Sequence, residues 1–365
     1  MARFLYLSIA VGILITALIF AYSSDVFAAV FTLTFSAAAA ATYLIIKFLL
    51  IPRFTQRGLT GTDMNKYDKP QIPEMGGIGV LFGFAFAVLV ALALFRVFDF
   101  PLNLTAVLAV FATVAIVGVI GVLDDLVGWK KGIEQWQHAL LPIFAALPLM
   151  VLPNTINTTM LTLPFIGPVE FGILYSLLVV PIAITGASNA VNMLAGFNGL
   201  EAGMGLIISF TLLIIGVLLP MDYPGKTETI IITAGMVGAL LAFLHFNWFP
   251  AKIFGGDSLT LMIGAAVASV AIVGNLEKVS MLLFGLYFLE LIFKAKHRFR
   301  SECYGIPQKN GRLKPDPRGG SLTQWVMRRG SFTERQVVLA ILGMQVLVSA
   351  FVMGLFWFKL FNLVG

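Results

Sequence analysis

The sequence predicts an all-α, polytopic integral membrane protein with about eleven transmembrane helices. Apolar residues make up 59% of its 365 residues and charged residues only 12%, which is about half the charge of a soluble domain. The apolar residues form long stretches with few charges. The single cysteine, Cys303, excludes an internal disulfide framework and a multi-cysteine metal site. The composition also excludes a disordered chain and a nucleic-acid-binding protein.

The apolar stretches are long enough to cross a bilayer, which takes roughly 20 residues of helix. They are expected to form one membrane domain, residues 1–365, with spans at 4–22, 27–50, 76–98, 104–123, 138–153, 171–192, 203–221, 228–245, 258–274, 279–295 and 334–361. Residues 1–26 are interpreted as an additional N-terminal transmembrane helix and not as a signal peptide, because no convincing small-residue cleavage site follows the apolar run.

The basic residues orient these spans, since cytoplasmic loops of membrane proteins carry an excess of Lys and Arg. We therefore expect a cytoplasmic N-terminus and an exterior C-terminus. In this orientation only four of the 24 Lys and Arg residues lie on the outer side, namely Arg96, Lys226, Lys278 and Lys359. The cytoplasmic loops are then 51–75, 124–137, 193–202, 246–257 and 296–333. They also hold paired acids, asparagines and glycines, so we expect the active site on the cytoplasmic face.

The first two loops place acids beside glycines or at a helix end. The first contains Gly58-Leu59-Thr60-Gly61-Thr62-Asp63-Met64-Asn65-Lys66, and glycines that flank polar residues suit a backbone that approaches a ligand closely. A turn capped by Asp63 is the alternative. The second begins with Asp124-Asp125. Adjacent carboxylates repel, and a cation such as Mg²⁺ would relieve that repulsion, although solvation at a helix end explains the pair as well.

The third loop region, Ser188 to Gly203, holds three asparagines in ten residues. Asn189 and Asn192 lie three residues apart, which places both amides on one helix face. Unsatisfied amides at the end of an apolar helix are costly. They are therefore expected to ligate Mg²⁺ or to bind a phosphate or a base edge, with hydrogen bonds between helices as the alternative.

The fourth loop, His245 to Ser258, contains Pro250, which breaks the helix, and Gly255-Gly256 just before Asp257. Asp257 would open the next span as its N-cap. A helix N-terminus also favours anions, so the same place suits a phosphate.

The fifth loop, 296–333, is the longest and begins with Lys296-His297-Arg298. A basic juxtamembrane cluster is most often an orientation signal or a contact with anionic lipid, and the alternative is a pyrophosphate clamp. Within the tenth span, Glu290 is expected to pair with Lys294, four residues further on.

Together these loops resemble the polyprenyl-phosphate N-acetylhexosamine-1-phosphate transferases, and most closely the eukaryotic and archaeal branch that starts N-glycan assembly. The residues that carry the resemblance run in order from about residue 45 to the end: Gly61 to Lys66, Ile72-Pro73-Glu74, Asp124-Asp125, Asn189 to Gly203, His245 to Asp257, and Lys296-His297-Arg298. Bacterial relatives usually carry acids at the positions of Ala195 and Asn198.

The resemblance implies transfer of N-acetylglucosamine 1-phosphate from UDP-N-acetylglucosamine to a polyprenyl (dolichyl-type) phosphate, with release of UMP. This is the first step of lipid-linked oligosaccharide assembly for N-glycosylation. By resemblance, Asn192 and Asp257 hold Mg²⁺, with Mn²⁺ as an alternative, on the donor pyrophosphate. Asp124 and Asp125 position or deprotonate the lipid phosphate. Direct attack by that phosphate is favoured over a covalent intermediate on Asp124.

The remaining assignments by resemblance concern the donor and the lipid phosphate. Arg298, with Lys296 and His297, contacts the phosphates and the sugar of the donor. Substrate-binding roles on the uridine side or beside it fall to Asp63, Met64, Glu74, Asn189, Asn198 and Phe254. The family commonly has a Lys shortly after the acidic pair, where this chain has His138. Either His138 contacts the phosphate, or Lys130 or Lys131 reaches it.

The expected partners are UDP-N-acetylglucosamine, the polyprenyl or dolichyl phosphate and the lipid bilayer, with no nucleic acid and with a homodimer left open. The membrane would be the cell membrane in an archaeon or the endoplasmic reticulum in a eukaryote, and the additional N-terminal span fits an archaeal source. Another UDP-N-acetylhexosamine is the alternative donor. A muramyl-peptide donor is disfavoured because the last loop contains only His297 and no histidine-rich motif. A transporter is the alternative function, although the sequence has no internal repeat.

Overall fold

The computed structural model describes residues 26–128, 140–152, 159–163 and 167–358. In this part of the chain, seven helical segments are long and apolar enough to cross a membrane. They are α2 (Val26–Ile45) continued by η1 (Ile46–Leu50) and α3 (Ile51–Arg57), α4 (Gly77–Val97), α5 (Leu104–Gly128), η2 (Tyr175–Val179) continued by α9 (Val180–Met193), α10 (Leu200–Leu218), α11 (Lys226–Asn247) and α16 (Glu334–Trp357). The predicted integral membrane, helical class is confirmed.

Three other predicted spans are shorter or interrupted. The prediction at 138–153 corresponds to α7 (Pro142–Ala145) and α8 (Leu147–Met150), each with a proline in its first turn, where the missing N–H is tolerated. The prediction at 279–295 is divided at Phe284 into α13 (Glu277–Leu283) and α14 (Gly285–Lys296). Gln345 Nε2 donates to the Leu283 carbonyl (3.0 Å) beside this break. The predicted span at 4–22 lies outside the described residues.

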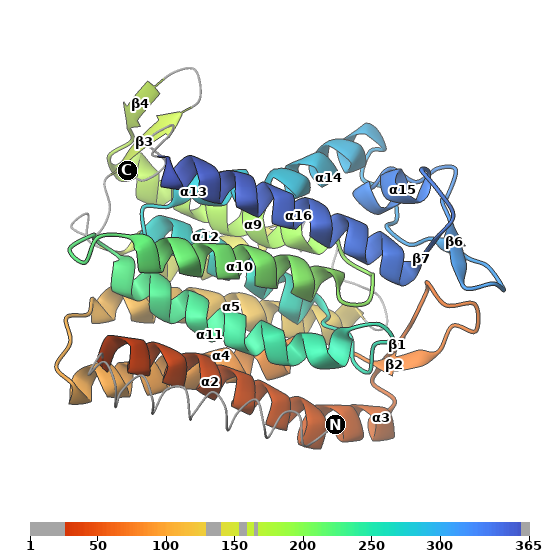
Figure 1. The fold of residues 1–365 in the computed structure, drawn as a ribbon, viewed down its shortest axis with the longest axis horizontal. Helices are drawn as coiled ribbons and strands as arrows, with labels where there is room; N and C mark the ends of the chain where they lie inside the picture. Colours follow the sequence, from red (N-terminus) through yellow and green to blue (C-terminus); the bar gives the residue numbers. More distant parts are fainter. Residues whose placement is uncertain (1–25, 129–139, 153–158, 164–166, 359–365) are drawn as a thin grey trace.

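The remaining prediction, 258–274, is α12 (Asp257–Val273), a helix of 17 residues whose side chains are buried from Ser258 onward. It packs against α5, α9, α4 and α11 and so lies at the centre of the bundle (Figure 1). Glycines allow these close approaches. A Cβ at Gly264 would lie 2.3 Å from the Ala187 carbonyl of α9, and one at Gly121 would lie 2.5 Å from the Ser258 Cα.

Short antiparallel strand pairs lie in the connecting segments. One hairpin pairs β1 (Thr60–Thr62) with β2 (Gln71–Pro73), and another pairs β3 (Met160–Leu163) with β4 (Gly167–Glu170). The fifth loop forms a sheet of β5 (Ile306–Pro307), β6 (Arg312–Lys314) and β7 (Phe332–Thr333), with helix α15 (Leu322–Met327) before β7.

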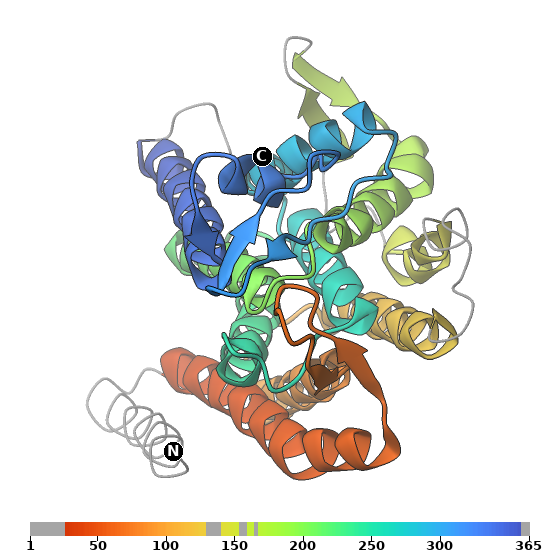
Figure 2. The ribbon, with the colours of Figure 1, turned by 90° about the vertical axis from the view of Figure 1, so that its right-hand side faces the viewer.

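The connecting segments divide between the two ends of the bundle. The β1–β2 hairpin lies at the same end as β6, β7 and α15, whereas β3 and β4 lie at the opposite end (Figure 1). Figure 2 looks onto the first of these ends, where the hairpin and the fifth loop come together over the helix ends. The loops that carry the sequence motifs therefore meet at one end.

Candidate active site

A cavity of ≈ 220 Å³ lies among these loops and helix ends. It gathers eight of the residues that the sequence assigned to the site, namely Asp63, Met64, Glu74, Asp125, Asn192, Asn198, Phe254 and Asp257. They come from the first, third and fourth of the loops that carry the motifs and from the adjoining ends of α5, α9 and α12. Segments that are far apart in the sequence thus contribute to one polar cavity.

The N-terminus of α12 is capped by a carboxylate from another helix. Asp125, near the end of α5, accepts hydrogen bonds from the backbone N–H of Asp257 (Oδ1, 2.7 Å) and of Ser258 (Oδ2, 3.2 Å). Gly256 precedes the helix with φ +73°, and a Cβ there would lie 2.4 Å from Asp125 Oδ2. A glycine is therefore required for this close approach.

This arrangement corrects two expectations about Asp257. The N-cap position is held by Gly256, and Asp257 is the first residue of the helix, so Asp257 is not the cap. The anion at the helix N-terminus is the Asp125 carboxylate, which already accepts from the first two N–H groups. A substrate phosphate therefore does not find these two donors available, and the Asp257 side chain instead lines the cavity.

Backbone hydrogen bonds join the first and fourth loops across the start of α4. Phe254 N–H donates to the Pro73 carbonyl (2.7 Å), and Gly76 N–H donates to the Phe254 carbonyl (2.8 Å). They place Glu74 and Phe254 next to each other on the cavity wall. Burial, together with the negative charge of Asp257, raises the pKa of Glu74 above its usual range.

Asn192, near the C-terminal end of α9, faces the same cavity as Asp257. The Thr260 hydroxyl of α12 donates to Asn192 Oδ1 (3.1 Å). That bond orients the Asn192 amide relative to α12. Within the described ranges no three His, Cys, Asp or Glu side chains gather into a metal centre, so a divalent cation would need the Asn192 and Asp257 oxygens together with ligands from substrate or water.

Five assigned residues that the structure describes do not line the cavity. Asp124 is buried beside Asp125, and Asn189 Nδ2 donates to the Thr185 carbonyl of its own helix (2.9 Å). Lys296, His297 and Arg298 are exposed at the end of α14, and His297 Nδ1 lies 2.9 Å from the Phe293 carbonyl. The sixth, His138, lies outside the described residues. The roles assigned to these residues remain predictions.

The fifth loop reaches the cavity through a different residue, Tyr304, which the sequence did not single out. Its ring packs on Gly196, where a Cβ would lie 2.5 Å from Tyr304 Cε1. Burial raises the pKa of the Tyr304 phenol, with a smaller contribution from the charge of Glu201. No local pattern marks a single tyrosine in a basic loop as a site residue.

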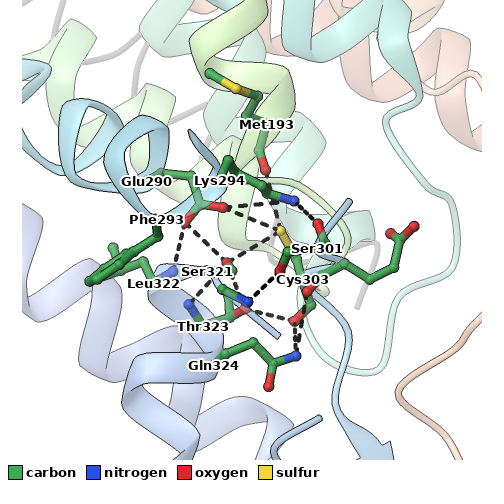
Figure 3. Close-up of polar contacts among 12 residues, drawn as sticks. Met193, Glu290, Phe293, Lys294, Ser301, Cys303, Ser321, Leu322, Thr323 and Gln324 are labelled. Carbon is green, nitrogen blue, oxygen red and sulfur yellow. Dashed lines mark hydrogen bonds and ion pairs between the residues drawn. The ribbon is translucent and has the colours of Figure 1, made fainter. Parts of the chain in front are cut away.

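A buried polar network holds this loop on α14 (Figure 3). Glu290 Oε2 accepts from Leu322 N–H (2.6 Å) and from the Ser321 hydroxyl (3.0 Å). Glu290 Oε1 lies 3.9 Å from Lys294 Nζ, which confirms the predicted pair. Gln324 Nε2 donates to the Tyr304 carbonyl (2.6 Å), so the network also fixes the backbone of Tyr304.

Other polar residues that the sequence left without a role stabilise the third loop. Asn247, at the end of α11, accepts from Gly199 N–H (3.0 Å) and donates to the Ile253 carbonyl (3.0 Å). Glu201 Oε1 accepts from Gly196 N–H (2.5 Å). Both residues stand inside the motifs that carry the resemblance, which is the only sequence signal that could have found them.

Cys303 belongs to the buried network around Glu290 (Figure 3) and is expected to react slowly with thiol reagents. Its thiol donates to the Met193 carbonyl (3.2 Å) and is 4% exposed, and burial raises its pKa to about 11. The thiolate is the reactive form, so maleimide labelling near pH 7.5 should be at least about 100-fold slower in the folded protein than in denaturant. Mass spectrometry measures the labelled fraction.

A matched variant calibrates this measurement. In Cys303→Ser/Ser331→Cys, the only thiol stands at an exposed position of the same loop, and it should label rapidly in the folded state. Equal labelling rates for Cys303 and for this exposed thiol in folded protein would contradict the buried network.

Comparison with known proteins shows similarity over most of the chain. Residues 107–275 match the family described as glycosyl transferase family 4. A protein of Saccharolobus solfataricus, provisionally described as a UDP-N-acetylglucosamine–dolichyl-phosphate N-acetylglucosaminephosphotransferase, is 36% identical over 79% of this chain and 85% of its own length. A Sulfolobus acidocaldarius protein with the same provisional description is 37% identical over 80% of this chain and 87% of its own length. The Schizosaccharomyces pombe UDP-N-acetylglucosamine–dolichyl-phosphate N-acetylglucosaminephosphotransferase is 28% identical over 64% of this chain and 59% of its own length.

Proposed function

Because the chain belongs to glycosyl transferase family 4, among the archaeal and eukaryotic N-acetylglucosaminephosphotransferases, we propose that it transfers N-acetylglucosamine 1-phosphate from UDP-N-acetylglucosamine to a dolichyl-type polyprenyl phosphate. UMP is released, and the product starts the assembly of a lipid-linked oligosaccharide for N-glycosylation. The observation that carries the proposal is that one cavity at the helix ends combines Asn192 and Asp257 with Asp63, Asn198 and Phe254. The polyprenyl chain of the acceptor would lie in the membrane beside the apolar helices.

Asn192 and Asp257 are the residues that would hold Mg²⁺, with Mn²⁺ as the alternative. Mg²⁺ prefers oxygen ligands and is commonly bound by one or two carboxylates together with substrate phosphates and water. One carboxylate and one amide oxygen facing the same cavity fit that preference. A bound Mg²⁺ would neutralise charge on the donor pyrophosphate. Because Asn192 lies on α9 and Asp257 on α12, the packing of these two helices would set the position of the pyrophosphate.

The reaction that this site supports is an in-line displacement. An oxygen of the lipid phosphate attacks the phosphorus that carries N-acetylglucosamine. A new P–O bond forms while the bond to UMP breaks, and UMP leaves with the bridging oxygen. The lipid phosphate is already an anion, so it needs positioning and charge neutralisation more than a strong base. Asp124 and Asp125 are proposed to position it without a covalent intermediate, and His138 to contact it.

The fifth loop is proposed to reach the donor from the cytoplasm, through Arg298 with Lys296 and His297. In this proposal the cavity faces the cytoplasm, the N-terminus is cytoplasmic and the C-terminus is exterior, in the cell membrane of an archaeon or in the endoplasmic reticulum of a eukaryote. The distribution of Lys and Arg supports this orientation. A homodimer is compatible with the proposal.

The proposal is tested with the full chain in proteoliposomes. We expect UMP release from UDP-N-acetylglucosamine that requires both a polyprenyl phosphate and Mg²⁺, stops with EDTA, and resumes when Mg²⁺ is restored. Omission of the lipid phosphate is the matched control. UDP-N-acetylgalactosamine, assayed in parallel, should show a lower kcat/KM. A higher value for that sugar would change the donor, and transport of nucleotide sugar without UMP release would favour the alternative of a transporter.

A further inference from the structure

Lys66, in the β1–β2 hairpin, contacts two carboxylates from distant parts of the chain. Its Nζ lies 3.1 Å from Asp63 Oδ2 and forms an ion pair with Glu334, the first residue of α16. The same Nζ lies 4.3 Å from the centre of the Phe249 ring of the fourth loop, within the range of a cation–π contact. One cation thus joins the first loop, the fourth loop and the start of α16.

The two carboxylates hold one residue of the cavity wall from two directions. Asn198 Nδ2 donates to Asp63 Oδ2 (3.1 Å), and the backbone N–H of Asn198 donates to Glu334 Oε1 (2.9 Å). Asn198 and Asp63 both line the cavity, whereas Lys66 and Glu334 do not. Lys66 and Glu334 therefore contact the cavity wall through Asp63 and Asn198.

The charges make this arrangement depend on Lys66. Asp63 is 4% and Glu334 2% exposed, so neither carboxylate has much water to stabilise its charge. Two buried carboxylates that share one neighbour repel each other unless a cation lies between them. Glu334 gains some stabilisation from the N-terminus of α16, but Asp63 has no such helix end. Without Lys66, the wall formed by Asp63 and Asn198 is expected to shift.

We propose that Lys66 and Glu334 are positioning residues that fix the Asp63–Asn198 wall for binding of the nucleotide half of the donor. This inference rests on the proposed function and adds two residues that the resemblance left without a role. The side chain of Lys66 neutralises both carboxylates, and Glu334 orients the backbone of Asn198. In the proposed function the lipid phosphate is positioned by Asp124 and Asp125 of α5 and not by this wall, so its binding should not depend on the pair.

The test is the Lys66→Met variant, which keeps the length of the side chain and removes its charge. We expect KM for UDP-N-acetylglucosamine to rise about 10-fold or more, with kcat and KM for polyprenyl phosphate changed less than about threefold. Lys69→Met is the matched control, because Lys69 lies in the same loop and is exposed, and this variant should behave as the wild type. Lys66→Arg should restore the donor KM, because a guanidinium can serve both carboxylates.

Glu334→Gln provides an independent variant, since its amide oxygen can still accept from Asn198 while the charge is lost. The double variant Lys66→Met/Glu334→Gln should raise the donor KM less than the product of the two single effects, because the buried repulsion is removed with Glu334. UMP binding, measured by calorimetry without lipid, should weaken in parallel with the KM of each variant. This measurement does not require turnover or a particular sugar.

The outcomes separate the positioning role from a structural role and from the proposed function. An unchanged donor KM and UMP affinity in both Lys66→Met and Glu334→Gln would overturn the inference, whether or not their melting temperatures fall. Wild-type protein that binds UMP but does not turn over UDP-N-acetylglucosamine would instead overturn the proposed function. UMP binding by the variants would still test the pair in that case.

Discussion

Asp257→Asn is expected to lower kcat for UMP release by about 100-fold or more. The substitution keeps the size of a side chain that lines the cavity and removes its negative charge. Removing one preorganised hydrogen-bond donor from an oxyanion hole costs about 10²–10³ in kcat, and loss of a charged metal ligand is expected to cost a similar factor because Mg²⁺ is commonly bound by carboxylates. Asn192→Ala is expected to cause a similar loss. The measurement is steady-state UMP release as a function of Mg²⁺ concentration.

The control is Asp222→Asn, the same chemical change at an exposed position in the connection between α10 and α11, where activity should remain as in the wild type. Unaltered thermal unfolding of the Asp257 and Asn192 variants would show that the lost activity does not reflect misfolding. Near-full turnover with an unchanged Mg²⁺ dependence in either variant would contradict the metal assignment.

Asp125→Ala is expected to lower both stability and activity. The carboxylate accepts from two backbone N–H groups at the N-terminus of α12, and its removal leaves them without these acceptors. Loss of two hydrogen bonds to a charged group at a helix N-terminus should cost about 2–4 kcal/mol in the free energy of unfolding. Because the same bonds fix the backbone of Asp257, we also expect kcat to fall by about 10-fold or more. Unfolding in detergent and UMP release measure the two effects.

Two related variants identify the contact responsible. Asp125→Asn keeps one acceptor oxygen and should lose less stability than Asp125→Ala. Gly256→Ala leaves the carboxylate intact, but its Cβ would lie 2.4 Å from Asp125 Oδ2 and its φ of +73° is unfavourable for alanine. It should therefore destabilise the protein in the same way. Wild-type stability in Asp125→Ala would show that the cap does not hold α12.

The helices were predicted best where local composition alone determines that a segment forms a membrane-spanning helix. Long apolar runs must bury their backbone hydrogen bonds within one helix when they meet lipid, and seven predicted spans correspond to helices of sufficient length. The predictions were less accurate around residues 142–150 and 277–296. Pro142, Pro148 and the helix break at Phe284 divide those runs, and a count of apolar residues does not register such breaks.

The sequence by itself determined the membrane class and the clustering of motifs, because hydrophobicity and the alternation of spans are local properties. Eight assigned residues indeed line one cavity. Only the tertiary structure decided what those residues contact. Asp125 caps a helix that begins 132 residues later, and Lys66 pairs with Glu334 across 268 residues. Tyr304, and not the basic cluster at Lys296, reaches the cavity. Such partners are set by the packing of α5, α9, α12 and α16, and no spacing along a single chain encodes them.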